Sequence, residues 1–127
     1  MSQIWTGSFK STTYNSIYGN LKTELKPLTE WNYNTNVYIN FTGFISIIQA
    51  FFKKNMVANV VVKNNKEFYT TFGGANVRFI VPQTIKPDDD LIKGQYFVER
   101  GNYKSTGNFY LMKGDGNFGC ENNCSIM

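Results

Sequence analysis

Alternation of apolar and polar residues with a period of two recurs along most of this chain and constrains its fold more than any other feature. Between residues 17 and 25, apolar or small side chains alternate with polar ones, and Pro27 follows. Successive side chains of a β-strand point to opposite faces, so this pattern predicts a strand with one buried and one wet face. Two further sets with this spacing are Val37, Ile39, Phe41 and Val77, Phe79, Val81.

The pattern predicts about eight strands joined by short turns. Their predicted ranges are 4–10, 17–25, 37–43, 56–63, 67–72, 76–81, 91–99 and 103–113. Asn64-Asn65 and Gly73-Gly74 stand between strands, where turns need such residues. Amphipathic strands must close one face over a core, so we expect an all-β fold, a single small antiparallel barrel or sandwich.

The stretch from residue 44 to 54 fits two structures. Phe44, Ile47, Ile48 and Phe51 recur at helical spacing, and two lysines near its end suit a helix C-terminus. Ile45 and Phe52 lie off that face, which favours a continued strand. Both a short helix near 44–54 and a strand therefore stay open.

The length of 127 residues suits one domain. We expect a β-domain over residues 1–113. From residue 114 the chain becomes rich in glycine mixed with Asp, Asn and Glu, which is typical of a flexible linker. Residues 114–127 are therefore predicted to be a flexible tail.

The chain carries a formal charge of +4, and its basic residues are scattered. A nucleic-acid partner is not expected, because such surfaces cluster their basic residues. The sequence contains no histidine, the commonest general base and metal ligand. With no other catalytic constellation in view, we expect the protein not to be an enzyme.

The sequence shows neither a secretory signal nor a segment long and apolar enough to span a membrane. The first seven residues lack the basic and apolar regions of a secretory signal. The longest apolar stretch, residues 44–52, is far short of the roughly 20 residues that a membrane span requires. We therefore expect the protein in the cytosol.

The two cysteines, Cys120 and Cys124, both lie in the final eight residues, and the chain ends Cys124-Ser125-Ile126-Met127. These four residues resemble the CaaX ends of Ras-type GTPases and nuclear lamins. The resemblance implies farnesylation of Cys124, removal of Ser125, Ile126 and Met127, and methylation of the new terminus. It covers the tail alone, because the body has neither a phosphate-binding loop nor heptads.

A single prenyl chain gives reversible membrane binding, so stable anchoring needs a second signal. The residues before Cys124 are not basic, which makes Cys120 the candidate, as a palmitoylation site. A Cys120–Cys124 disulfide or half of a metal site is the alternative. Two thiols without histidine suit zinc poorly, and a reducing compartment disfavours disulfides.

These features predict a farnesylated β-domain that acts as a binding or adaptor module at the cytosolic face of a membrane. A protein is the expected partner, and no cofactor is expected beyond the covalent farnesyl lipid. Exposed aromatic residues near asparagines are candidates for contacts: Tyr14, Tyr18, Trp31, Tyr33 and Tyr38.

Two other functions stay open. The body could be a β-barrel carrier of a small apolar ligand, lined by the two inward sets, or these residues could simply fill the core. Asp88, Asp89 and Asp90 could contribute calcium ligands in a membrane-docking β-sandwich, or they could form a solvated loop.

Overall fold

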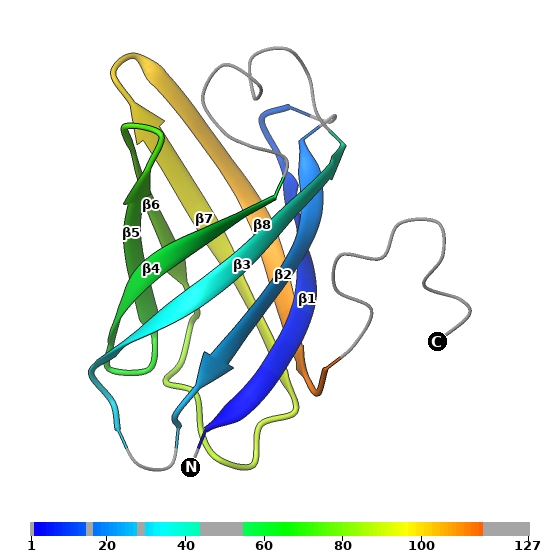
Figure 1. Cartoon of the computed structure of the whole chain (residues 1–127), viewed down its shortest axis with the longest axis vertical. Helices are drawn as coiled ribbons and strands as arrows, with labels where there is room; N and C mark the ends of the chain where they lie inside the picture. The colour runs from blue at the N-terminus through cyan, green and yellow to red at the C-terminus, as the bar shows by residue number, and fades with distance from the viewer. Residues whose placement is uncertain (1, 15–16, 28–29, 44–54, 116–127) are drawn as a thin grey trace.

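The computed structural model describes residues 2–14, 17–27, 30–43 and 55–115, and within them the chain forms eight strands and no helix. The predicted segment 44–54 and residues 116–127 lie outside the described residues. The strands, labelled in Figure 1, are β1 Gln3–Ser11, β2 Tyr18–Leu25, β3 Tyr33–Gly43, β4 Asn55–Lys63, β5 Glu67–Phe72, β6 Ala75–Ile80, β7 Leu91–Arg100 and β8 Tyr103–Lys113.

The eight strands close into one antiparallel barrel in simple sequential order (Figure 1). Each strand pairs with its neighbours in sequence, and β8 returns to β1 with Phe109 opposite Phe9. Pairing of the first and last strands buries one continuous inner face. The all-β prediction is therefore confirmed, and of the two predicted architectures the chain adopts the barrel.

Inward-facing side chains fill most of the barrel. Both predicted inward sets are buried, namely Val37, Ile39, Phe41 and Val77, Phe79, Val81. Aromatic rings meet edge to face in the interior, with centroids 5.2 Å apart for Phe79 and Phe109. Among the described residues, the interior includes cavities of about 50 Å³ and 20 Å³. Both are well below the several hundred Å³ of a usual ligand pocket.

Three glycines on the inner face make room for these rings. The cross-strand pairs are Phe9 with Gly19, Phe109 with Gly94, and Tyr96 with Gly107. A Cβ on Gly19 would lie 2.9 Å from a Phe9 ring carbon, and one on Gly94 would lie 2.8 Å from a Phe109 ring carbon. The barrel can therefore hold these large aromatic side chains, because the residue opposite each of them on the neighbouring strand is a glycine, which has no side chain.

Asn65 ties together the loops at the end of the barrel where the chain begins (Figure 1). Asn64 and Asn65 have φ values of 57° and 48°, which confirms the predicted turn. The Asn65 side chain is fully buried, and its Nδ2 donates to the Glu30 carbonyl at 3.1 Å. Its backbone N–H donates to the Trp31 carbonyl at 2.9 Å, and its carbonyl accepts from the Ile85 N–H at 2.8 Å. One turn residue thus joins three loops.

Strand β3 begins at Tyr33, earlier than the predicted residue 37. Residues 34–36 are polar and interrupt the apolar alternation, so the sequence pattern did not predict this part of the strand. Pairing of Tyr33 with Val62 on β4 extends the ladder, and the buried Tyr33 hydroxyl accepts the Lys26 N–H at 2.9 Å. The extension is therefore fixed by contacts distant in sequence.

Strands β4 and β5 share the shortest ladder in the barrel. Pairing runs only from Val61 with Tyr69 to Lys63 with Glu67. Beyond it, the Thr70 hydroxyl donates to the Asn59 carbonyl at 2.7 Å, in place of a continued backbone ladder. This junction is the least tightly joined part of the wall among the described strands.

Candidate functional site

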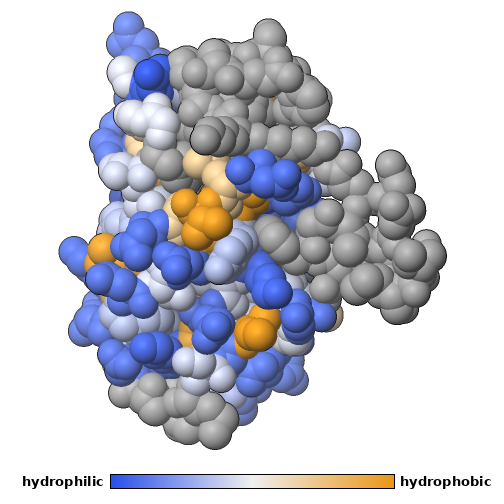
Figure 2. Space-filling model, in the orientation of Figure 1, coloured by the Kyte–Doolittle hydropathy of each residue, from blue (hydrophilic) through white to orange (hydrophobic). Residues whose placement is uncertain are grey.

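A groove of about 840 Å³ crosses the outer surface of β4 to β8. Its volume falls within the range of ligand-binding clefts, unlike that of the interior cavities. Figure 2 shows a different face of the barrel, formed mainly by β2, β3 and β4. This face is mostly hydrophilic, with separate apolar patches. The outward-facing residues that line the groove are Asn59, Val61, Tyr69, Thr71, Asn76, Arg78, Phe97, Glu99, Lys104 and Thr106. Four residues of the inner face also contribute to its lining, namely Thr70, Val77, Val98 and Ser105.

Strand register aligns the groove's largest side chains in one row. Val61 pairs with Tyr69, Tyr69 with Arg78, and Arg78 with Phe97. Side chains directly opposite on one face of antiparallel strands lie about 4.5–5.5 Å apart at their Cβ atoms, close enough for contact. We call these four residues the groove row.

Arg78 is the cation at the centre of the groove row. Its guanidinium lies over the Phe97 ring, 4.7 Å from the ring centroid, in a cation–π contact. No carboxylate among the described residues forms an ion pair with it. The stacked guanidinium therefore keeps its N–H donors available for an incoming acceptor.

Tyr69 is held in place from two sides. Its hydroxyl donates to the Glu67 carboxylate, which raises the pKa of Tyr69 above its ordinary value. The Lys63 ammonium lies over its ring, 5.3 Å from the centroid. At the edge of the groove, Lys104 and Glu99 form an exposed ion pair at 3.5 Å, which adds little to stability.

No pattern in the sequence predicts the groove row. Val61, Tyr69, Arg78 and Phe97 come from four strands, and each stands at an ordinary outward position of its own strand. The only local signal is that large or charged residues recur on the wet face of consecutive predicted strands. Register between strands was needed to bring them into one line.

The predicted acidic loop has its own local partners. Asp89 accepts the Lys86 N–H at 2.8 Å, and Asp90 forms an ion pair with Lys113 at 3.7 Å. Asp88 is exposed. Within the part of the chain that the structure describes, no three metal-ligating side chains gather to hold an ion. The calcium alternative remains a prediction, and a thermal shift measured with calcium tests it.

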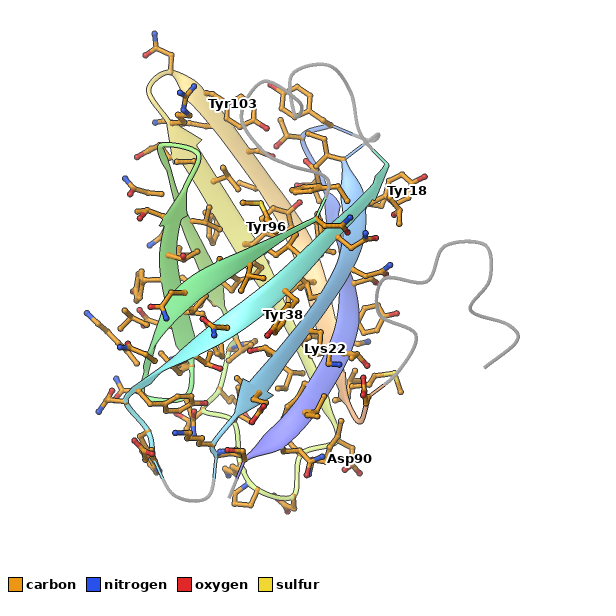
Figure 3. The ribbon with its side chains drawn as sticks, in the orientation of Figure 1. Tyr18, Lys22, Tyr38, Asp90, Tyr96 and Tyr103 are labelled. Atoms are coloured by element: carbon orange, nitrogen blue, oxygen red, sulfur yellow. The ribbon has the colours of Figure 1, made fainter. Side chains whose placement is uncertain are left out.

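The structure separates the five aromatic candidates. Tyr33 is buried, and Tyr14 stacks on Tyr103 with ring centroids 5.8 Å apart. Tyr18, Trp31 and Tyr38 are exposed, but Trp31 lies in the β2–β3 loop, and Figure 3 places Tyr18 at the far end of the barrel from it. These residues do not form one surface.

The predicted lipidation residues Cys120, Cys124, Ser125, Ile126 and Met127 lie outside the described residues. The chain after β8 is described as far as residue 115. The Gly114 N–H donates to the Ile4 carbonyl at 2.8 Å, and Asp115 forms an ion pair with Lys22 at 3.0 Å. The chain therefore leaves the barrel at the end where β1 begins.

No family model and no curated protein matches this sequence. Within the described residues, no helix is long and apolar enough to cross a membrane.

Proposed function

We propose that this protein is a lipid-anchored β-barrel that binds a protein partner at the cytosolic face of a membrane. The groove across β4 to β8 is the observation that carries the binding role. It has the volume of a binding cleft, and its row combines aromatic side chains with an arginine, the residue types that dominate binding energy at protein interfaces.

An extended, acidic segment of the partner is the occupant that the groove favours. The lining contains two cations, Arg78 and Lys104, and one carboxylate, Glu99. Lys104 already pairs with Glu99, so Arg78 is the group that a partner carboxylate would engage. Val61 and Phe97 would supply apolar contact on either side of that charge.

The anchoring role rests on the sequence of the tail. Farnesylation of Cys124 and palmitoylation of Cys120 would together supply the two signals that stable attachment needs. Because the chain leaves the barrel at the end where β1 begins, the tether would attach at that end and leave the outer wall, with its groove, accessible. The absence of histidine and of a catalytic constellation supports a binding role rather than catalysis.

Site-specific photocrosslinking in the cells that make the protein tests the binding role. A benzophenone side chain would replace Asn76 in the groove or, as a matched control, Asn108 on the outer face of β8 outside the groove lining. We expect a discrete protein adduct from position 76 only, lost in Arg78→Glu and retained in Arg78→Lys. Equal adducts from both positions, or an adduct indifferent to Arg78→Glu, would contradict the proposal.

Fractionation of wild type, Cys124→Ser and Cys120→Ser tests the anchor. Wild type should be in the membrane fraction, Cys124→Ser in the soluble fraction, and Cys120→Ser divided between them. Labelling with a palmitate analogue should disappear in Cys120→Ser. If all three proteins fractionate alike, the anchoring role fails while the groove remains to be judged by crosslinking.

A further inference from the structure

Three large apolar side chains lie exposed together on the outer wall of the barrel, where β7, β8 and β1 adjoin. Leu91, Tyr110 and Met112 are 48%, 41% and 55% exposed. Leu91 stands directly opposite Met112, and Tyr110 is two residues from Met112 on the same face of β8. Single apolar residues are common on protein surfaces, whereas a contiguous group indicates an interaction site. We call these three residues the apolar patch.

Strand register places two lysines beside the apolar patch. Lys93 of β7 pairs with Tyr110, and Lys10 of β1 lies one row further along the same face. Both lysines are exposed, and neither forms an ion pair among the described residues. The three cross-strand rows of outward residues that contain the patch and these lysines include no acidic side chain. The nearest carboxylate along the chain, Asp90, is paired with Lys113. This face is therefore both apolar and positively charged.

The chain leaves the barrel beside the apolar patch. Lys113, the last residue of β8, follows Met112 directly, and the chain is described as far as Asp115. Nine residues lead from Asp115 to Cys124, so even a fully extended tail would span only about 30 Å. A lipid on Cys124 would therefore hold the patch close to the surface of a membrane.

We propose that the apolar patch and its two lysines are the surface through which the barrel contacts an anionic lipid leaflet. This inference rests on the tail as the proposed anchor and adds the orientation of the barrel on the membrane. The apolar side chains would enter the boundary between headgroups and acyl chains, while Lys93 and Lys10 would meet the anionic headgroups. Tyr110 suits this boundary because its ring is apolar and its hydroxyl is polar.

The groove across β4 to β8 stays accessible in this orientation. On β7 and β8 its outward residues nearest to the patch are Phe97 and Thr106, which pair with each other. They lie four residues along these strands from Lys93 and Tyr110, which corresponds to about 13 Å. From there the groove continues toward β4, away from the patch. A membrane at the patch would therefore leave the groove open to a partner.

Paramagnetic relaxation on lipid nanodiscs tests which face of the barrel meets the lipid. The isotope-labelled full chain with Cys120→Ser would be joined through the Cys124 thiol to a maleimide lipid. The discs would contain phosphatidylserine and a lipid with a gadolinium-labelled headgroup. This chemical tether replaces the prenyl group, so the result does not depend on farnesylation in cells. We expect amide relaxation to be strongest at Lys93 and Met112 and weak at Val57, which lies on β4 at the opposite side of the barrel.

Matched variants separate the contribution of the patch from that of the tether. Leu91→Ser combined with Met112→Ser should abolish the preference for this face, whereas Val57→Ser, at an equally exposed position, should retain it. Lys93→Gln should lower the ratio of membrane-docked to undocked barrel about 5-fold, and discs of phosphatidylcholine alone should lower it further. Relaxation strongest at another face, or a pattern that the double variant leaves unchanged, would overturn the proposal. Cell fractionation and groove crosslinking decide the anchor and the partner site separately.

Discussion

The phenol ring of Tyr96 lies directly over the α-carbon of Gly107, its cross-strand partner on β8. A Cβ on Gly107 would stand 2.5 Å from the Tyr96 hydroxyl oxygen and closer still to the ring. The position of the buried hydroxyl therefore depends on a residue that has no side chain.

Gly107→Ala should destabilise the barrel because the new methyl group displaces the Tyr96 ring from a filled core. Overpacking of this kind costs about 1–3 kcal/mol of unfolding free energy. Urea unfolding of the single variants and of Gly107→Ala combined with Tyr96→Ala measures the coupling. We expect Gly107→Ala to cost much less in the Tyr96→Ala background. An equal loss of unfolding free energy in both backgrounds would show that Gly107→Ala acts through the backbone and not through contact with the Tyr96 ring.

Asn65→Ala should cost more stability than any other turn substitution in the β4–β5 connection. The change removes the buried hydrogen bond to the Glu30 carbonyl and puts alanine at a positive φ. Together these losses should reach about 2–3 kcal/mol. Asn65→Gly keeps the backbone conformation and should lose only the bond. Asn64→Gly, at the exposed neighbouring position, serves as the control and should be nearly neutral in thermal unfolding.

Thr70→Val should loosen the junction of β4 and β5. It removes the hydroxyl that donates to the Asn59 carbonyl at 2.7 Å while keeping the shape of the side chain. We expect a loss of about 1 kcal/mol. Amide hydrogen exchange should accelerate at Val61 and Val62 more than in β7 and β8. Uniform acceleration along the whole chain would show that the bond has no local role.

Stability should fall as the pH rises above 10, because burial raises the pKa of Tyr96 above the ordinary tyrosine value of about 10 that applies to the unfolded chain. The unfolded chain then releases protons that the folded chain retains, so the stabilisation present below pH 10 is progressively lost above it. Tyr33 and Tyr103 shift in the same direction. Each such group contributes up to about 1.4 kcal/mol per pH unit.

Chemical unfolding of wild type and Tyr96→Phe across this pH range isolates the contribution of Tyr96. The variant should lose less stability than wild type between neutral and strongly alkaline pH. Tyr110→Phe, at an exposed position, is the control and should follow wild type. A Tyr96→Phe curve parallel to that of wild type would contradict the assignment.

The sequence by itself determined where most of the strands lie and which of their residues face the core, although not the start of β3. Period-two alternation placed Val37 and Phe79 inside, and the turn at Asn64-Asn65 followed from residues that tolerate positive φ. These properties are local, since each depends on neighbouring residues and on the two-residue repeat of a strand. The predicted lipid anchor is likewise a local pattern, carried by the last residues alone.

Only the tertiary structure decided the architecture and the sites. A barrel and a sandwich both bury one face of each strand, so alternation cannot distinguish them. A slide of two residues between neighbouring strands keeps every side chain on its face, and alternation therefore leaves register open as well. Register nevertheless aligns Tyr69, Arg78 and Phe97 in the groove and sets Tyr96 over Gly107. The groove thus arises from the register between neighbouring strands, which the alternation of residues leaves open.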